Sequence, residues 1–222
     1  MNARGALRGS QAGLIRGCCL GLLVLAALAI FAAVEGFRAL ADPNLGDLPA
    51  GAAHGSSVAV IAGALAGDAA TQLLTGEHAA VTLSEQDLTV IAVARNPSPD
   101  RFRDPQVRIR NGLVVVTGQS SVGPFGVTPV ARTQLTFDNS SGTPQITAQV
   151  VSFAVGQLDL PLWLATRLDP RASASINLTN LFASNPALKL LAQAMECVTI
   201  HPDGVHVGFH RPGVVADSSR CG

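Results

Sequence analysis

An unbroken apolar run near the N-terminus constrains this chain more than any other feature. The 18 residues of 17–34 carry no charge, and Arg4, Arg8 and Arg16 precede them. As a helix, such a run extends roughly 27 Å, which is just enough to cross the hydrocarbon core of a bilayer. Because the basic residues come before the run, the positive-inside rule predicts a single-pass cell-membrane protein with a cytoplasmic N-terminus and an extracytoplasmic remainder.

A cleaved signal peptide is the alternative interpretation of this segment. Ala39-Leu40-Ala41 has the small-x-small form of a cleavage site. The apolar run is longer than a usual signal-peptide core, however, and Glu35 and Arg38 lie between the run and that site. An uncleaved anchor is therefore favoured, and both interpretations export the rest of the chain.

This argument divides the chain into five parts. We expect a cytoplasmic N-terminus over 1–16, a transmembrane anchor over 17–35, a tether over 36–56, an extracytoplasmic α+β domain over 57–211 and a C-terminal tail over 212–222. The tether is assigned because its Pro, Gly and Asp residues interrupt any apolar period.

The charge balance limits the partners of the exported part. The chain has 15 basic and 15 acidic side chains, whereas nucleic-acid binding needs a concentrated excess of Lys and Arg. We therefore expect no nucleic acid as a partner. With 48% apolar and 14% charged residues, the chain also differs from disordered proteins.

Cysteine usage is consistent with export. Cys197 and Cys221 both lie on the exported side and are candidates for one disulfide, whereas Cys18 and Cys19 lie in the anchor. The alternative is a buried free Cys197 with an unpaired Cys221. Neither cysteine has the spacing of a metal ligand with another.

Two helices open the exported domain. Apolar residues at spacings of three and four predict a helix from residue 58 to Gly76: Val58, Ile61, Leu65, Ala69 and Leu73. A second helix is predicted to begin at Ser84, with Asp87 completing a capping box, and to end near Ala94. Ser84, Glu85 and Asp87 also suggest a catalytic cluster, but the chemistry of a helix start accounts for all three.

From Pro105 the apolar period changes to two, which predicts strands. Asn111-Gly112 and residues 139–142 are turn signals for two hairpins, and an offset at Val151 suggests a bulge. Short helices are expected around Trp163 and over 186–195, followed by a closing hairpin of strands 197–200 and 205–209. The predicted fold class is α+β, an N-terminal transmembrane helix followed by an elongated, curved antiparallel sheet packed on helices.

No catalytic or metal-binding motif occurs in the sequence. Phosphate loops, nucleophile elbows and zinc-protease helices are absent, so we expect a non-catalytic protein without a cofactor. His206 and His210 are four residues apart on a predicted strand, roughly 13 Å, which is too far for one metal ion. Arg108 and Arg110 share a strand face, which suggests either contact with anionic lipid head groups or a solvated surface.

Three segments resemble the YpmS-like family of single-pass bacterial membrane proteins. They are VTLSEQDLTVI (81–91), FAVGQLDLPLWLATRL (153–168) and VTIHPDGVHVGF (198–209). Thr89 departs from the family pattern, which tends to carry Asn there. The resemblance implies a TULIP-like lipid-binding fold, in which a long helix lies in a curved sheet and acyl chains occupy the apolar channel between them.

The leading hypothesis is a membrane-anchored extracytoplasmic domain that binds lipid or another hydrophobic ligand in cell-envelope biogenesis. The predicted ligand-binding residues are Val58, Ile61, Leu65, Leu113, Val115, Leu135, Val150, Phe153, Leu158, Leu160 and Trp163, of which the last three form the mouth of the groove or cap the core. The alternative is a dry-cored scaffold domain that binds another envelope protein. Apolar periodicity does not separate these two, because a groove and a packed core present the same pattern.

Overall fold

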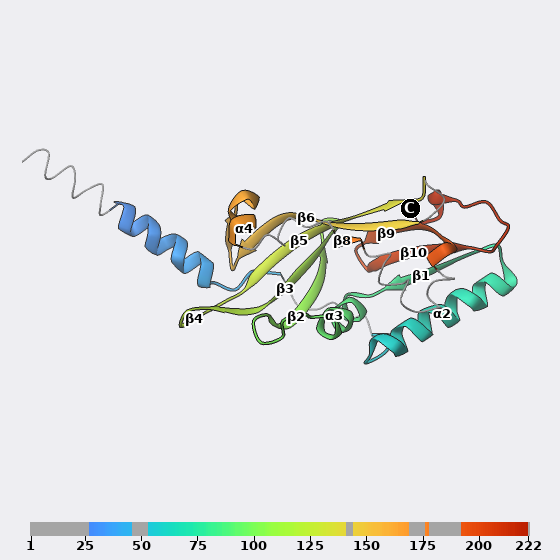
Figure 1. Cartoon of the computed structure of the whole chain (residues 1–222), viewed down its shortest axis with the longest axis horizontal. Helices are drawn as coiled ribbons and strands as arrows, with labels where there is room; N and C mark the ends of the chain where they lie inside the picture. The colour runs from blue at the N-terminus through green and yellow to red at the C-terminus, as the bar shows by residue number, and fades with distance from the viewer. Residues whose placement is uncertain (1–26, 46–52, 141–143, 169–175, 178–191, 222) are drawn as a thin grey trace, which may run out of the picture.

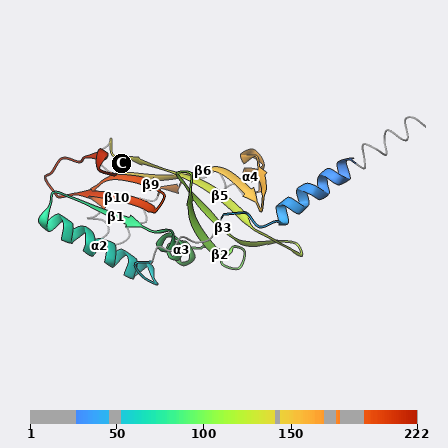
Figure 2. The ribbon, with the colours of Figure 1, turned by 180° about the vertical axis from the view of Figure 1, so that it is seen from behind.

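The computed structural model describes residues 27–45, 53–140, 144–168, 176–177 and 192–221. This part of the chain is α+β, with antiparallel sheets and a few helices, as predicted. Figures 1 and 2 show an elongated molecule, with a helix over residues 27–40 at one end and helix α2 (Val58–Thr75) at the other. Residues 17–26 of the predicted anchor and most of the predicted helix 186–195 lie outside the described residues.

The larger sheet has seven strands. Its main path runs β2-β3-β5-β6-β7, while β4 pairs with β3 and β8 pairs with β6. The strands are β2 (Arg103–Arg110), β3 (Leu113–Val122), β4 (Phe125–Val127), β5 (Pro129–Asp138), β6 (Gln145–Val155), β7 (Leu158–Leu160) and β8 (Ile176–Asn177). A short helix, α4 (Leu162–Leu168), follows β7.

Two local predictions for this sheet are confirmed. Asn111 and Gly112 adopt positive φ angles of 54° and 72°, as the tight turn between β2 and β3 requires. Between β5 and β6 the register shifts, because Arg132 pairs with Ser152 and Thr133 with Val150. Val151 is therefore the extra residue of a β-bulge.

The smaller sheet contains a strand that the sequence analysis missed. Its order is β1-β10-β9, formed by β1 (His78–Leu83), β9 (Met195–His201) and β10 (Gly204–His210). The sequence analysis predicts no strand at His78, whereas the structure pairs His78 with His210 at the start of β1. The closing hairpin was predicted correctly, but its sheet partner was not.

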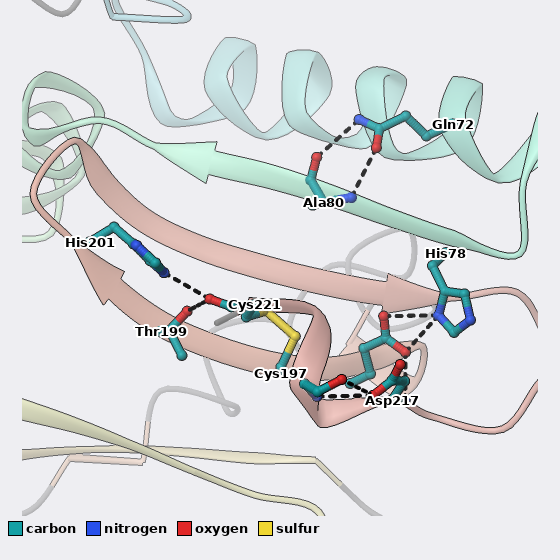
Figure 3. Close-up of a disulfide and its surroundings, with 10 residues drawn as sticks. Gln72, His78, Ala80, Cys197, Thr199, His201, Asp217 and Cys221 are labelled. Carbon is teal, nitrogen blue, oxygen red and sulfur yellow. Dashed lines mark hydrogen bonds and ion pairs between the residues drawn. A yellow bond between two sulfur atoms is a disulfide. The ribbon is translucent and has the colours of Figure 1, made fainter.

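Helix α2 covers the smaller sheet. Ser57 caps its first turn, and Gln72 bonds to both backbone groups of Ala80 on β1, at 2.9 and 3.0 Å (Figure 3). Among the described residues, α2 is the one helix that is long and apolar enough to span a membrane, a property that the core helix of a soluble protein can share. Ile61 and Ala69 are buried against the sheet, so α2 serves here as its cover.

One main core joins the two sheets. It combines apolar side chains of α2 and the smaller sheet with Ile109 of β2 and Ile146 of β6. A second, smaller cluster lies within the larger sheet and consists of Val115, Val130 and Ala154, with Leu45 packed against it.

Helix α3 (Glu85–Ala94) begins at the predicted capping box and then closes the edge of β2. Ser84 and Asp87 cap each other's backbone N–H groups, as expected. Glu85 instead reaches across to β2, where its Oε1 accepts hydrogen bonds from the N–H of Ile109 at 2.6 Å and from Arg110 at 2.9 Å. Thr89 adds a second such contact, because its hydroxyl accepts from the N–H of Val107 at 3.0 Å.

Both described ends of the predicted tether are held by hydrogen bonds that involve α3 or its partner strand. Arg110 donates to the Leu45 carbonyl through Nη2 at 2.7 Å and Nε at 3.1 Å. Gln86 accepts from the Ala53 N–H at 2.8 Å, and Asp87 accepts from both the N–H and the ring of His54, at 2.8 and 2.7 Å.

The helix over 27–40 is joined to the turn between β6 and β7. Gln157 donates its N–H to the Arg38 carbonyl at 2.9 Å and its side-chain amide to the Asp42 carbonyl at 3.0 Å. The preceding residue, Gly156, has a φ of +57°, and a Cβ there would lie 2.5–2.7 Å from three carbonyl oxygens of residues 38–41. Only glycine allows this close approach.

The C-terminal tail folds back over β9 and β10. The structure joins Cys197 and Cys221, the pair that the sequence analysis offered, in a disulfide (Figure 3). Gly208 makes room for it, because a Cβ at this position would lie 2.4 Å from the Cys197 sulfur. The buried Glu196 carboxylate contacts the His78 ring at 3.0 Å and accepts from the Asp217 N–H at 2.9 Å, which fixes the tail a second time.

Replacement of Gly156 by Ala is expected to release residues 38–42 from the β6–β7 turn, because the added Cβ has no room. Hydrogen exchange of the Gln157 amide in the full chain measures this, and we expect faster exchange than in the wild type. Gly112→Ala is the matched control, since Gly112 also has a positive φ but nothing within 4 Å of its Cβ position. Both variants incur backbone strain of about 1 kcal/mol, so equal protection of the Gln157 amide in the two would contradict the proposed joint.

Asp87 makes stability depend on pH. Burial by itself would raise the pKa of Asp87, but the hydrogen bonds from His54 and Ser84 outweigh it and hold the pKa below its ordinary value of 3.8. We expect Asp87→Asn to lower the free energy of unfolding near neutral pH by roughly 1–3 kcal/mol, because Asn replaces one of two acceptor oxygens with a donor. The loss should begin to shrink as the pH falls through 3.8, where the carboxylate of the unfolded chain becomes protonated, and should shrink further as the pH falls through the lower pKa of the folded protein.

Urea unfolding of both proteins near neutral pH and at about pH 3 measures this difference. Asp68→Asn on the exposed side of α2 is the control, with an expected change within about 0.5 kcal/mol at either pH. A difference for Asp87→Asn that does not change with pH would show that the carboxylate charge has no role.

Candidate functional site

An apolar pocket lies between α2, the end of α3 and the smaller sheet. Its volume is about 160 Å³. Helix α2 supplies Val58, Ile61, Ala62, Leu65 and Ala66, and the sheet supplies Val81, Leu83, Met195, Val207 and Phe209. Ile91 and Arg95 of the α3 end and Ala192, just before β9, complete the wall. Every lining side chain except that of Arg95 is apolar.

The helix spacing explains how α2 builds its side of the pocket. Residues 58, 61, 62, 65 and 66 recur at intervals of three and four, so they share one face of the helix. The alanines among them are short, and space is left where a larger side chain would fill the gap. The pocket is therefore a consequence of small residues on the packed face of α2.

Arg95 is the one charged residue of the lining. It follows the last turn of α3, where its N–H bonds to the Ile91 carbonyl at 2.9 Å, and it is exposed. Within the described part of the chain, no acidic side chain forms an ion pair with it. The pocket thus combines an apolar interior with a cation that has no protein counter-ion there.

The predicted ligand-binding residues separate into several groups. Val58, Ile61 and Leu65 line the pocket, and Leu135 packs against the same main core. Val115 belongs instead to the smaller cluster of the larger sheet. Leu113 and Val150 are half-buried on β3 and β6, outside the pocket lining.

The predicted mouth of the groove is not at this pocket. Phe153 pairs with Leu160 between β6 and β7, and Leu158 pairs with Val155 in the same ladder. Trp163 follows on α4, where it is 63% exposed. Figures 1 and 2 place α4 toward the end of the molecule that carries the helix over 27–40, away from α2. The predicted ligand-binding residues therefore do not lie along one continuous groove in the described part of the structure.

Ser84, Asp87 and His54 meet in an arrangement that resembles a nucleophilic triad but differs in order. The Asp87 carboxylate accepts from the Ser84 hydroxyl at 2.7 Å and contacts the His54 ring at 2.7 Å. In a triad the imidazole contacts the nucleophile and removes its proton. Here the carboxylate lies between the other two groups, so the contacts stabilise the start of α3 and the loop before α2.

Of the two strand arginines, Arg108 is not solvated, contrary to one of the two predicted interpretations, because it is only 5% exposed. The Arg110 side chain is 36% exposed and pairs with the buried Glu85. Arg108 lines a polar cleft of about 640 Å³ between residues 42–45 and strands β2 and β3. Asp42 and Asp104 line the same cleft, so residues of both charge signs contribute to its wall.

The sequence analysis considered His206 and His210 as a pair, but the structure brings His206 next to His201 instead. His206 lies next to His201 across the β9–β10 turn, with ring centroids 4.1 Å apart. The sequence signal for this contact is the spacing of two histidines around a hairpin turn, because residues diagonal to each other on paired strands are within reach. His210 lies at the far end of β10, paired with His78.

Comparison of the chain with protein-family models, with curated proteins and with solved structures gives no match. The resemblance to the YpmS-like family therefore remains a prediction carried by three short segments. The function has to be argued from the pocket and its surroundings.

Proposed function

We propose that the exported domain binds the apolar part of an anionic amphiphile, such as a lipid, in the pocket beneath α2, without catalysing a reaction. The observation that carries this proposal is the apolar lining together with Arg95, which forms no ion pair with any residue that the structure describes. Envelope biogenesis is the setting that the predicted export and the cell-membrane anchor give to such a domain.

The size of the pocket limits what part of a ligand enters it. A dry apolar cavity of about 150 Å³ holds a molecule of the size of benzene. The pocket of about 160 Å³ therefore accommodates the end of an acyl chain or a ring, and the rest of the ligand lies outside. A TULIP-like channel that holds a whole acyl chain would be longer than this pocket. The whole-chain channel that the family resemblance implies is therefore not part of this proposal.

Arg95 favours an anionic ligand over a neutral one. A guanidinium is always charged at physiological pH and binds carboxylates and phosphates through paired hydrogen bonds. Because it stands at the end of an apolar wall, it would contact the head group while the chain occupies the interior. This division between apolar body and charged end is the pattern of an amphiphile.

The helix over 27–40 supports a membrane source for the ligand. Its large apolar side chains are at least half exposed around the helix: Leu28, Ile30, Phe31, Val34, Phe37 and Leu40. Exposed apolar surface of this kind is stable in lipid but costly in water. Together with the uncharged residues 17–26, it favours the predicted single-pass anchor.

An interaction domain is the second candidate. Val60 and Leu74 are 53% and 84% exposed on the outer side of α2, where a partner protein would find an apolar contact. The division of the predicted groove residues between separate clusters also favours a packed interior. The two functions differ in whether the pocket beneath α2 contains a ligand.

A variant that fills the pocket distinguishes the ligand-binding function from the interaction domain. Ala66→Phe places a ring in the pocket, and we expect it to lower the amount of copurifying amphiphile by about tenfold or more, since small changes in an apolar pocket change binding by 10–200-fold. Native mass spectrometry of the full chain released from detergent, followed by organic extraction, measures the bound ligand. Ala70→Phe on the exposed side of α2 is the matched control and should retain the wild-type amount.

Arg95→Glu tests the head-group contact in the same experiment. We expect the remaining ligand to shift from anionic to neutral or cationic species, because the charge at the pocket edge is reversed. Wild-type protein without any bound amphiphile, even after incubation with excess lipid, would contradict the carrier function and favour the interaction domain.

A further inference from the structure

The β9–β10 turn, far along the chain from the pocket-lining face of α2, brings together three side chains that ligate metals. His201 ends β9, Asp203 lies in the turn and His206 lies on β10. One ligand atom from each of the three lies within 4.8 Å of the other two. Two imidazoles and a carboxylate form a donor set typical of zinc and related divalent ions.

The strand register explains why the side chains converge. His201 pairs with Gly204 and His206 pairs with Thr199, so the two histidines are diagonal neighbours on one face of the hairpin. Their rings stack with an angle of 20° between the planes. Asp203, two residues after His201, projects from the turn to the same place.

The distances between His206 and Asp203 match those between two ligands of one ion, and the ligand atom of His201 lies within 4.8 Å of both. His206 Nε2 lies 3.1 and 3.2 Å from the two oxygens of Asp203. Ligand atoms about 2.0–2.1 Å from a tetrahedral zinc ion lie roughly 3.3 Å from each other. An ion can therefore enter between these groups with small side-chain rotations.

His201 also has the outer contact that metal-binding histidines usually have. Its Nε2 lies 2.8 Å from the Cys221 carbonyl oxygen, which only accepts, so Nε2 carries the proton and donates (Figure 3). Nδ1 then has the free lone pair. Ligating histidines typically donate their other ring N–H to a carbonyl or carboxylate, which orients the ring.

The disulfide fixes this outer contact. Thr199 donates its hydroxyl to the same Cys221 carbonyl, and the Cys197–Cys221 bond holds the residue over β9. The carbonyl that orients His201 is therefore held from two sides. Two of the three candidate ligands stay accessible, since the Asp203 side chain is 68% exposed and that of His206 27%.

We propose that His201, Asp203 and His206 form a binding site for a divalent transition-metal ion of the zinc class. Three protein ligands leave a fourth position for water or for a group of a partner. The site is independent of the pocket beneath α2 and of the ligand proposed for it, because the two share no residue.

Zinc titration of the full chain in detergent, without an affinity tag, tests this proposal by isothermal calorimetry. We expect one site in the wild type and a loss of affinity of at least about tenfold for both His206→Ala and Asp203→Asn. His210→Ala on the same strand is the matched control and should bind within about twofold of the wild type. No binding up to about 1 mM zinc, or equal binding by His206→Ala, would overturn the proposal.

A double variant, Cys197→Ser with Cys221→Ser, tests the role of the outer contact and does not remove a ligand. We expect zinc affinity to fall by about 10–100-fold, the usual loss when the orienting partner of a ligating histidine is removed. Thermal unfolding with and without zinc shows whether each variant is folded, and a bound ion should raise the wild-type midpoint. Zinc affinity lost in His78→Ala but retained in His206→Ala would place the ion elsewhere and overturn the assignment.

Discussion

The unpaired edge of β2 is the constraint on which the rest of the structure depends. An edge strand leaves N–H groups without partners, and burying one costs about 1–3 kcal/mol. Glu85 and Thr89 accept from the N–H groups of Ile109 and Val107, so α3 substitutes for a further strand. Because α3 directly follows β1, this contact also determines how the smaller sheet lies against the larger one.

The same first turn of α3 controls the pocket from a distance. Asp87 holds His54 just before α2 begins, so the walls formed by α2 and α3 are fixed at one polar cluster. Arg95 lies eight residues further along α3, roughly 12 Å away at 1.5 Å per residue. An apolar pocket of this shape therefore depends on hydrogen bonds that do not line it, and the buried carboxylates of α3 have a structural explanation.

Local signals in the sequence predicted much of the fold, whereas contacts between residues far apart along the chain were not predicted. The capping box at Ser84 and the turn at Asn111-Gly112 are encoded within a few residues, and both were predicted. Strand β1 was missed because it is paired with β10, whose partner residues are more than 100 positions away along the chain. Glu85 was assigned to the helix start alone, since no sequence pattern shows that its carboxylate would reach β2.

The candidate site likewise combines features that local sequence patterns predicted with features that depend on long-range packing. The period of α2 predicted Val58, Ile61 and Leu65 correctly as one face, and the structure places all three at the pocket. Arg95 and the His201–His206 contact were not recognised, because each depends on which elements pack together. The joint at Gly156 has a mechanical consequence as well. One hydrogen bond joins the turn to Arg38 in the helix, and a second joins it to Asp42 just after the helix, so a force on residues 27–40 would be transmitted into the β6–β7 ladder.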